Sequence, residues 1–458
     1  MSSALSLETC YPLLITASLE TLLRPGYHQG YDVYLTSNVI FKCIRSEVKV
    51  MWGYIEYLKD PHLVLYVQQF FGVSFKEEKK NHLKKNDKLL FKETEVLSDD
   101  SDNHKFSNNH YYDKSNSEEL SSDSDSEKKN YKINNFFWYY VFVLGTELGD
   151  EIFYATFIPF WFWNIDGAVG RRIVMVWTIV MYIGQGLKDI ICWPRPSSPP
   201  VFRLQKKWIM EYGMPSTHAM VAISIPFSVL LYTMQRYEYP FLIGLCVAVL
   251  WCWVVSVSRL YLGMHTVADV IAGIILALVL LIPLVPLVDF MDMFLLTSRW
   301  SPIILLTISI CVIVFHPKDK IWTPTRGDTA MIVSVCVGIH IGAWTNYQLG
   351  QMSESPLSPP YTIIWPNYEM LGLVFLRSAL GFSCILATRA ICKSACYATL
   401  STLGVSTEPI ETPSSLKNTI DLIFKYITYS LIGFNTLHLL PSTFKMLSID
   451  RPTFYTEI

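Results

Sequence analysis

A chain of 458 residues in which 51% of the side chains are hydrophobic is more apolar than an ordinary soluble protein. The formal net charge of −2 excludes the basic excess expected of a nucleic-acid or anionic-surface binder. Composition therefore favours a membrane protein whose partner is the bilayer, with no nucleic acid involved. Protein partners are not indicated by the sequence.

The N-terminal third divides by composition. Residues 1–75 mix apolar and polar side chains, and 57–73 (YLKDPHLVLYVQQFFGV) predict a short helix with one apolar face. That helix either lies at the membrane interface or packs on the folded domain. In residues 76–132, Lys, Glu, Asp, Asn and Ser dominate, with runs such as SSDSDSEKK. This composition predicts a disordered, charged, Ser-rich insertion.

The remaining chain is a succession of apolar segments near the ~20 residues that a membrane-spanning helix needs. They predict an all-α, polytopic membrane helix bundle with about nine transmembrane segments. Residues 133–290 would form the core and 291–458 the C-terminal transmembrane helices. We expect spans at about 137–163, 173–191, 218–235, 240–257, 267–288, 302–316, 329–345, 370–391 and 419–440. The first carries Glu147, Asp150 and Glu151, which are costly in hydrocarbon, so it is expected to be broken or re-entrant.

The first polar cluster, Lys188 to Pro196, lies where an apolar helix should end. A spacing of seven residues returns to nearly the same side of a helix, so Lys188 and Arg195 can face one site. Pro194 and Pro196 should stop the helix there. The alternative is a pair of cations that only anchor the helix at the membrane surface.

The second cluster is Pro215-Ser216-Thr217-His218, directly before an apolar run. Ser and Thr favour helix N-caps, and the exposed N–H groups of a helix start can bind phosphate. His218 would project from the first turn into that position. A plain cap with an interfacial histidine is the alternative.

The third cluster, Ser258 to Asp269, joins two apolar runs and contains Arg259 and His265. His265 and Asp269 are four residues apart, so on one helix face the carboxylate could accept the imidazole N–H. An imidazole oriented in this way can act as a nucleophile or base. A helix-surface pair is the alternative.

Helix direction brings the three clusters together. If consecutive spans alternate across the membrane, all three lie on one face, and two histidines and several cations converge. That combination indicates a phosphate-transfer site.

The order and spacing of these residues resemble the three-part signature of the type 2 phosphatidic acid phosphatase superfamily, K-x6-R-P, P-S-x-H and S-R-x5-H-x3-D. Every polar position of the signature is filled between Lys188 and Asp269. Thr217 departs from the glycine usual in the second motif, and in this it resembles the sphingosine-1-phosphate phosphatase branch. The similarity outside the motifs is less specific.

The resemblance implies a role for each matching position. His265 would be the nucleophile, Asp269 its orienting group, and His218 the acid that protonates the departing alcohol and then activates water. The phosphoryl oxygens would be held by Lys188, Arg195, Ser216, Thr217 and Arg259. No metal or other cofactor is expected, because cations of the chain would neutralise the phosphate.

The resemblance also implies a substrate and a location. The substrates would be sphingosine 1-phosphate and related long-chain base phosphates, hydrolysed through a phosphohistidine intermediate at the endoplasmic reticulum membrane, with a lumenal site. A broader lipid or sugar phosphatase, or a non-catalytic lipid-binding or transport protein, are the alternatives. Glu211 could pair with the amine of a sphingoid substrate, or with Lys206, Lys207 or Arg203.

Overall fold

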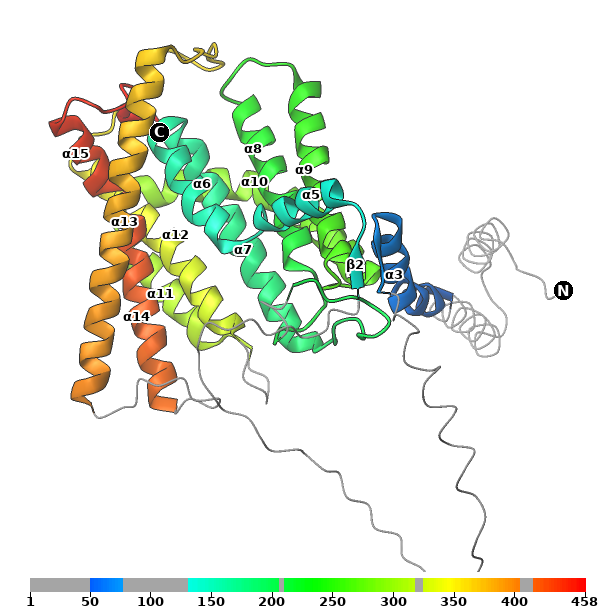
Figure 1. The fold of residues 1–458 in the computed structure, drawn as a ribbon. Helices are drawn as coiled ribbons and strands as arrows, with labels where there is room; N and C mark the ends of the chain where they lie inside the picture. Colours follow the sequence, from blue (N-terminus) through cyan, green and yellow to red (C-terminus); the bar gives the residue numbers. More distant parts are fainter. Residues whose placement is uncertain (1–49, 77–130, 206–209, 318–323, 404–414) are drawn as a thin grey trace, which may run out of the picture.

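The computed structural model describes residues 50–76, 131–205, 210–317, 324–403 and 415–458 (Figure 1). These ranges are mostly helical, as expected, with a two-stranded antiparallel sheet of β1 (Val73–Phe75) and β2 (Tyr131–Ile133). The shorter helices are α3 (Pro61–Phe70), α5 (Phe136–Glu147), α6 (Glu151–Asn164), α11 (Ser301–Val314), the π-helix η1 (Asn435–Leu439), α15 (Leu440–Met446) and η2 (Phe454–Thr456). The longer ones are α7 (Gly167–Ile191), α8 (Thr217–Met234), α9 (Phe241–Tyr261), α10 (Val267–Thr297), α12 (Thr325–Gln348), α13 (Tyr368–Thr402) and α14 (Ser415–Phe434).

Six of the described helices are long and apolar enough to cross a membrane, namely α7, α8, α9, α10, α12 and α13. The expected count of about nine is not confirmed. α11 has only 14 residues, and α14 carries Lys417, Asp421 and Lys425 along its length. Because several of its helices are long and apolar enough to cross a bilayer, the chain is a multi-pass membrane protein.

The first expected span is broken, as its carboxylates predicted. α5 ends at Glu147 and α6 begins at Glu151. Asp150 caps α6, because its side chain accepts a hydrogen bond from the backbone N–H of Glu151 at 3.0 Å. The break places Asp150 and Glu151 beside a cavity of the protein.

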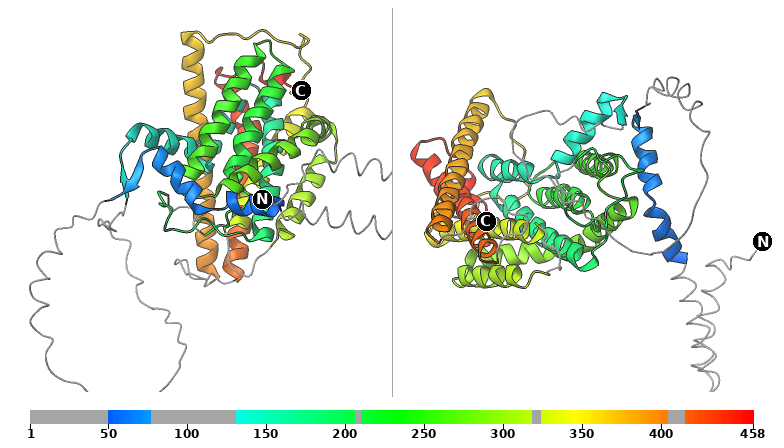
Figure 2. Two further views of the ribbon diagram at one scale, coloured as in Figure 1. Left: turned by 90° about the vertical axis from the view of Figure 1, so that its right-hand side faces the viewer. Right: turned by 60° about the horizontal axis from the view of Figure 1, so that its bottom comes forward.

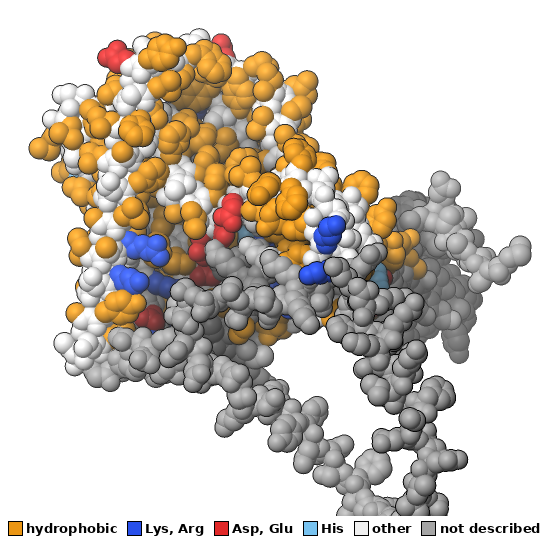
Figure 3. All heavy atoms as spheres, viewed as in Figure 1, with side chains coloured by type: hydrophobic (Ala, Val, Ile, Leu, Met, Phe, Trp, Pro, Cys, Tyr) orange, Lys and Arg blue, Asp and Glu red, His pale blue; other side chains and the backbone are white. Residues whose placement is uncertain are grey.

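The long helices form a bundle with its apolar faces turned outward. α7, α8 and α12 lie in the middle, α13 and α14 at one side and α3 at the other (Figures 1 and 2). Hydrophobic side chains cover most of the visible helical surface (Figure 3), including Ile282 of α10 and Phe375 of α13, which are 77% and 74% exposed. Such a surface suits lipid.

Buried ion pairs join the elements at the end of the bundle where α7 begins. Arg171 Nε lies 2.9 Å from Asp292 Oδ1 of α10, and both side chains are buried. Arg236 Nε, after α8, lies 2.9 Å from Asp166 Oδ2, just before α7. Because breaking one partner would leave a buried charge, these pairs fix how the helices meet.

The N-terminal helix α3 packs on the folded domain, one of its two expected positions. The side chain of Gln68 is fully buried and donates to the carbonyl oxygens of Phe202 at 2.6 Å and Tyr261 at 2.9 Å. Strand β1 follows α3 and pairs with β2, with Val73 opposite Ile133. The chain therefore leaves for and returns from residues 77–130 at adjacent points.

Candidate active site

Lys188 lies in the last turn of α7, where its side chain is buried. The helix ends at Ile191, and Cys192 adopts the left-handed conformation that closes it. Arg195 is thus beyond the helix, and the expected seven-residue helical spacing is not what aligns the two cations. An extended segment carries Arg195 into the site, where its Nε donates to the carbonyl oxygen of Glu211 at 2.8 Å and its Nη1 to that of Met264 at 2.7 Å.

The second cluster begins α8, as predicted. Ser216 is the N-cap, and its hydroxyl accepts from the N–H of Ala219 at 3.4 Å. The backbone N–H of Ser216 donates to the carbonyl oxygen of Asp269 at 3.1 Å, which joins the second cluster to the third. The ring of His218 packs on Gly149 at the α5–α6 break, so closely that a Cβ on Gly149 would lie 2.6 Å from His218 Cδ2.

Arg259 occupies the last turn of α9 and is fully buried. Its Nη1 donates to the hydroxyl of Thr146 and to Gln205 Oε1 at 3.2 Å. Its Nε and Nη2 have no hydrogen-bond partner in the described part of the chain. Buried guanidinium N–H groups without an acceptor are costly, and an anion bound among the cations would satisfy them.

His265 is held by its backbone surroundings. Its Nδ1 lies 2.8 Å from the carbonyl oxygen of Gly213, and its Nε2 lies 3.3 Å from Arg195 Nη1. A guanidinium only donates, so Nε2 carries a lone pair and Nδ1 carries the proton. This is the tautomer in which Nε2 can attack phosphorus.

The expected hydrogen bond from His265 to Asp269 is absent, and this corrects the sequence-based prediction. His265 precedes α10, whose N-cap is Thr266, and Asp269 Oδ2 accepts from the Thr266 N–H at 2.8 Å in a capping box. The carboxylate lies 3.8 Å from His265 Nδ1. Asp269 Oδ2 is therefore bonded to the start of α10, and the ring contact of His265 Nδ1 is with the carbonyl oxygen of Gly213.

Glu211 lies beside Lys188 and Arg195, two of the cations expected to hold the phosphate. Its Oε2 is 2.6 Å from Lys188 Nζ and 4.0 Å from Arg195 Nη2. Burial raises the pKa of Glu211, but its ion pairs with Lys188 and Arg195 outweigh this, so the pKa lies below its ordinary value. Arg203 instead donates to the carbonyl oxygen of Pro196 at 3.2 Å. Lys206 and Lys207, the other expected partners, lie outside the described residues.

Burial and surrounding positive charge keep His265 neutral. The side chain is 1% exposed. Its burial, followed by the charges of Arg195, Arg259 and Lys188, holds the pKa of His265 well below its ordinary value. At neutral pH the imidazole therefore retains its nucleophilic lone pair.

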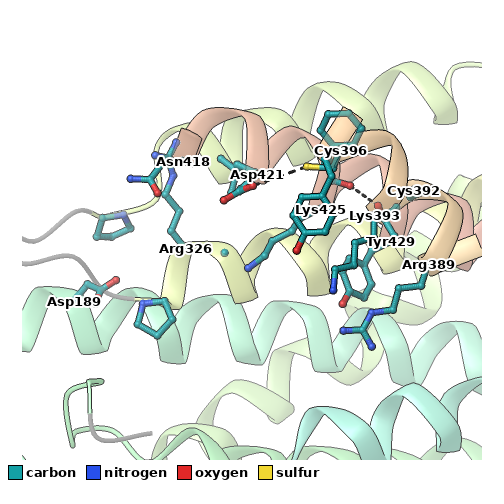
Figure 4. Close-up of a pocket in the computed structure, with 17 residues that line it drawn as sticks. Asp189, Arg326, Arg389, Cys392, Lys393, Cys396, Asn418, Asp421, Lys425 and Tyr429 are labelled. Atoms are coloured by element: carbon teal, nitrogen blue, oxygen red, sulfur yellow. Dashed lines mark hydrogen bonds between the residues drawn. The ribbon is translucent and has the colours of Figure 1, made fainter. Parts of the chain in front are cut away.

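A cavity of about 50 Å³ adjoins His218. One wall is formed by Thr217 and His218, and apolar lining comes from Tyr154, Trp177, Met181, Val221 and Ile332. A larger cavity of about 540 Å³ lies among α12, α13 and α14 (Figure 4). The larger cavity is lined by none of the candidate catalytic histidines or by Lys188, Arg195 or Arg259, whereas the small one is lined by Glu211, Thr217 and His218.

Sequence reasoning missed Gly213, Gly149, Thr146 and Gln205. Gly213 contributes a carbonyl oxygen, which has no side-chain signature, although a glycine two residues before Pro215 could have indicated a close approach of backbone. A Cβ there would lie 3.0 Å from Asp269 Oδ2 and 3.2 Å from the carbonyl oxygen of Pro194. Among the described residues, no group of three or more His, Cys, Asp or Glu side chains could hold a metal ion.

Comparison with known proteins agrees with this geometry. Residues 170–291, which include all three clusters, match the PAP2 superfamily. The chain is 39% identical over 327 residues to sphingosine-1-phosphate phosphatase 1 of Mus musculus, covering 70% of this chain and 74% of that protein. The chain belongs to the sphingosine-1-phosphate phosphatase family of the PAP2 superfamily.

Other members of the family show the same relationship. Sphingosine-1-phosphate phosphatase 2 of Homo sapiens is 38% identical over 324 residues, covering 70% of this chain and 81% of that protein. A dihydrosphingosine 1-phosphate phosphatase of Schizosaccharomyces pombe is 28% identical over 363 residues, covering 69% of this chain and 86% of that protein. No solved structure matches the chain. The chain is thus a lipid phosphate phosphatase of the phosphoric monoester hydrolase class.

Proposed function

We propose that this enzyme removes the phosphate of sphingosine 1-phosphate and related long-chain base phosphates through a phosphohistidine intermediate. The observation that carries the proposal is the arrangement at His265, whose lone-pair Nε2 lies 3.3 Å from the Arg195 guanidinium. A phosphoryl group approaching Nε2 would meet that cation at once. The names of the relatives support the choice of sphingoid substrates.

The first half-reaction transfers the phosphoryl group to the protein. His265 Nε2 attacks phosphorus, the bond from phosphorus to the lipid oxygen breaks, and His218 gives its proton to the departing alkoxide. In the phosphoimidazole the proton stays on Nδ1, which donates a hydrogen bond to the Gly213 carbonyl oxygen, 2.8 Å away in the structure. The Asp269 carboxylate, 3.8 Å from Nδ1, stabilises the positive ring.

The second half-reaction hydrolyses the phosphohistidine and regenerates the free enzyme. His218, now neutral, takes a proton from water as the water oxygen attacks phosphorus, and the nitrogen–phosphorus bond breaks to release inorganic phosphate. Lys188, Arg195 and Arg259 neutralise the phosphoryl oxygens in both steps, with the Ser216 hydroxyl and backbone N–H groups near Thr217 as further ligands. The chain's cations thus take the place that a metal holds in many phosphotransfer enzymes, and no metal is required.

The proposed topology has nine crossings in the endoplasmic reticulum membrane. In it α5 and α6 together make the first crossing, and α11 and α14 to α15 make two of the later ones. In chain order these three crossings come before, between and after the six long helices, and this order supports the count. The family resemblance implies that the catalytic residues would face the lumen. Residues 1–75 would be an N-terminal segment, 133–290 the phosphatase core and 291–458 a C-terminal helical unit. Most of the expected insertion, 76–132, lies outside the described residues, but Tyr131 and Lys132 belong to β2, so the insertion would end before them.

The test is phosphate release from a panel of substrates by purified membranes in EDTA. The panel contains sphingosine 1-phosphate, dihydrosphingosine 1-phosphate, phosphatidic acid, lysophosphatidic acid and a sugar phosphate, with His265→Ala membranes as the control. Preferential release from the two sphingoid phosphates supports the proposal. Equal release from all lipids would favour a broader phosphatase, and none would favour a lipid-binding or transport protein.

A further inference from the structure

The small cavity beside His218 has a second, acidic wall. Four carboxylate residues line it in addition to the catalytic histidine, namely Asp150, Glu151, Glu211 and Asp328. They come from the α5–α6 break, the loop before α8 and the first turn of α12. A phosphate needs cations around it, so a carboxylate of this wall that has no cation of the protein beside it would meet a different part of the ligand.

Asp328 is distinguished from the other three by its lack of a partner. Its side chain is 8% exposed and lines the cavity. In the part of the chain that the structure describes, its carboxylate accepts no hydrogen bond and forms no ion pair. A carboxylate buried in this way is unfavourable unless a cation meets it.

The neighbouring acidic residues already have other contacts. Glu211 is paired with Lys188 at 2.6 Å, and Asp150 caps α6. Lys425 packs beside Gly327, where a Cβ would lie 2.6 Å from its Nζ, and it lines the larger cavity (Figure 4). No ion pair joins Lys425 to Asp328 within the described ranges. Asp328 is therefore the acid of this wall for which the described residues supply no cation within ion-pair distance.

The other walls define that ligand. The His218 side leads to the phosphate site, and Trp177, Met181 and Ile332 provide an apolar surface. A ligand that fits all three walls has a phosphate, an ammonium group close to it and a hydrocarbon chain. A sphingoid base phosphate carries its amine on the carbon next to the one that bears the phosphate oxygen.

We infer that the Asp328 wall, with Glu151 beside the same cavity, is an ammonium subsite that selects sphingoid base phosphates. This inference rests on the proposed function and names the residue that gives it substrate selectivity. A charge-assisted hydrogen bond from the ammonium group to Asp328 would position the phosphate for attack by His265. A phosphate lipid without the amine would leave Asp328 unpaired and would bind less well.

The experiment compares dihydrosphingosine 1-phosphate, whose nitrogen is a charged ammonium, with its N-acetyl derivative, whose nitrogen is part of a neutral and bulkier amide. The wild-type enzyme should prefer the free amine in kcat/KM by about tenfold or more. Asp328→Asn should lose about tenfold on the amine substrate and little on the N-acetyl substrate, so the preference narrows. The matched control is Asp421→Asn, a carboxylate of α14 that lines the larger cavity (Figure 4), and it should keep the wild-type ratio.

Two outcomes would overturn the subsite. One is an equal fall on both substrates in Asp328→Asn, which would make Asp328 a structural residue. The other is equal inhibition of phosphate release by sphingosine, which has a free amine, and by N-acetylsphingosine, which has none. It is measured on the wild-type enzyme, so it does not depend on whether a variant folds. If the wild-type enzyme hydrolyses both phosphates equally, the phosphatase function stands and the subsite fails, whereas no phosphate release from either would contradict the function itself.

Discussion

The imidazole of His265 is held by a backbone oxygen, since its Nδ1 lies 2.8 Å from the carbonyl oxygen of Gly213. This contact fixes the ring plane and the tautomer together. It also links the nucleophile to the loop between the first and second clusters, so that a small displacement of this loop would misdirect Nε2.

Gly213→Ala should lower kcat by about 10- to 100-fold, since small misplacements of reacting groups have large effects on rate. The added Cβ would lie 3.0 Å from Asp269 Oδ2 and 3.2 Å from the Pro194 carbonyl oxygen, so the loop must shift. The measurement is steady-state turnover corrected for protein amount in membranes. Gly372→Ala, with nothing within 4 Å of its Cβ, is the control. A wild-type rate for Gly213→Ala would show that the position of this loop does not control turnover.

Arg195→Gln should move the acid limb of the kcat/KM profile to higher pH. Burial first, and then the charge of Arg195, lowers the pKa of His265. Removing this cation raises that pKa toward its ordinary value, so more of the imidazole is protonated, and unable to attack, at mildly acidic pH. The maximal rate should also fall by about 10²-fold or more, because a phosphate ligand is lost.

The same substrate is used for both proteins, so its own ionisation is common to the two pH profiles. Arg389→Gln, which removes a cation from the larger cavity, should leave the acid limb in place. An unchanged limb in Arg195→Gln would show that His265 ionisation does not control the rate.

Glu211→Gln should weaken catalysis on all phosphate lipids alike. The carboxylate lies 2.6 Å from Lys188 Nζ, so its loss disturbs a cation that every substrate meets. We expect kcat/KM to fall by about tenfold for both sphingosine 1-phosphate and lysophosphatidic acid, with their ratio unchanged. A fall for sphingosine 1-phosphate alone would place Glu211, instead of Asp328, at the substrate amine.

Removal of residues 78–130 should leave specific activity within about twofold, because charged Ser-rich tracts contribute little to packing. Strands β1 and β2 pair on either side of this segment, with Phe75 opposite Tyr131. The deletion leaves Lys76 and Glu77 as a two-residue connection, and a second version with Asn-Gly at these positions favours the tight turn. A large loss of activity in both versions, with normal protein amounts, would give the segment a role in the site or in folding.

The long apolar helices could be predicted from their composition, but some of their ends could not. α10 continues to Thr297 through Pro283 and Pro286, well past the expected end at 288, although each proline lacks the N–H that a helix interior uses. α7 closes at Cys192, three residues before Arg195. Local spacing rules cannot anticipate such ends, which depend on tertiary contacts.

The catalytic residue types were accessible from the sequence, but their contacts were not. The expected partner of His265 was Asp269, because a spacing of four suggests one helix face. In the structure Thr266 is the N-cap of α10 and follows His265, so Asp269 bonds to Thr266 instead. The carbonyl oxygen of Gly213 is the partner of His265 Nδ1. Asp328, more than fifty residues beyond the last cluster, reaches the cavity only through the packing of α12 on α7.

The central claim is that phosphate passes through His265, and trapping the phosphoenzyme tests it most directly. His218→Ala should phosphorylate His265 slowly, because it lacks the acid that protonates the departing alkoxide, and should lose the phosphate more slowly still, because water activation is also lost. Incubated over a series of times with sphingosine 1-phosphate carrying labelled phosphorus and then quenched in alkali, in which phosphohistidine is stable, it should accumulate label on His265. His265→Ala and the double variant should retain none and show no steady turnover. Label on the protein in His265→Ala, or continued phosphate release by it, would contradict the mechanism.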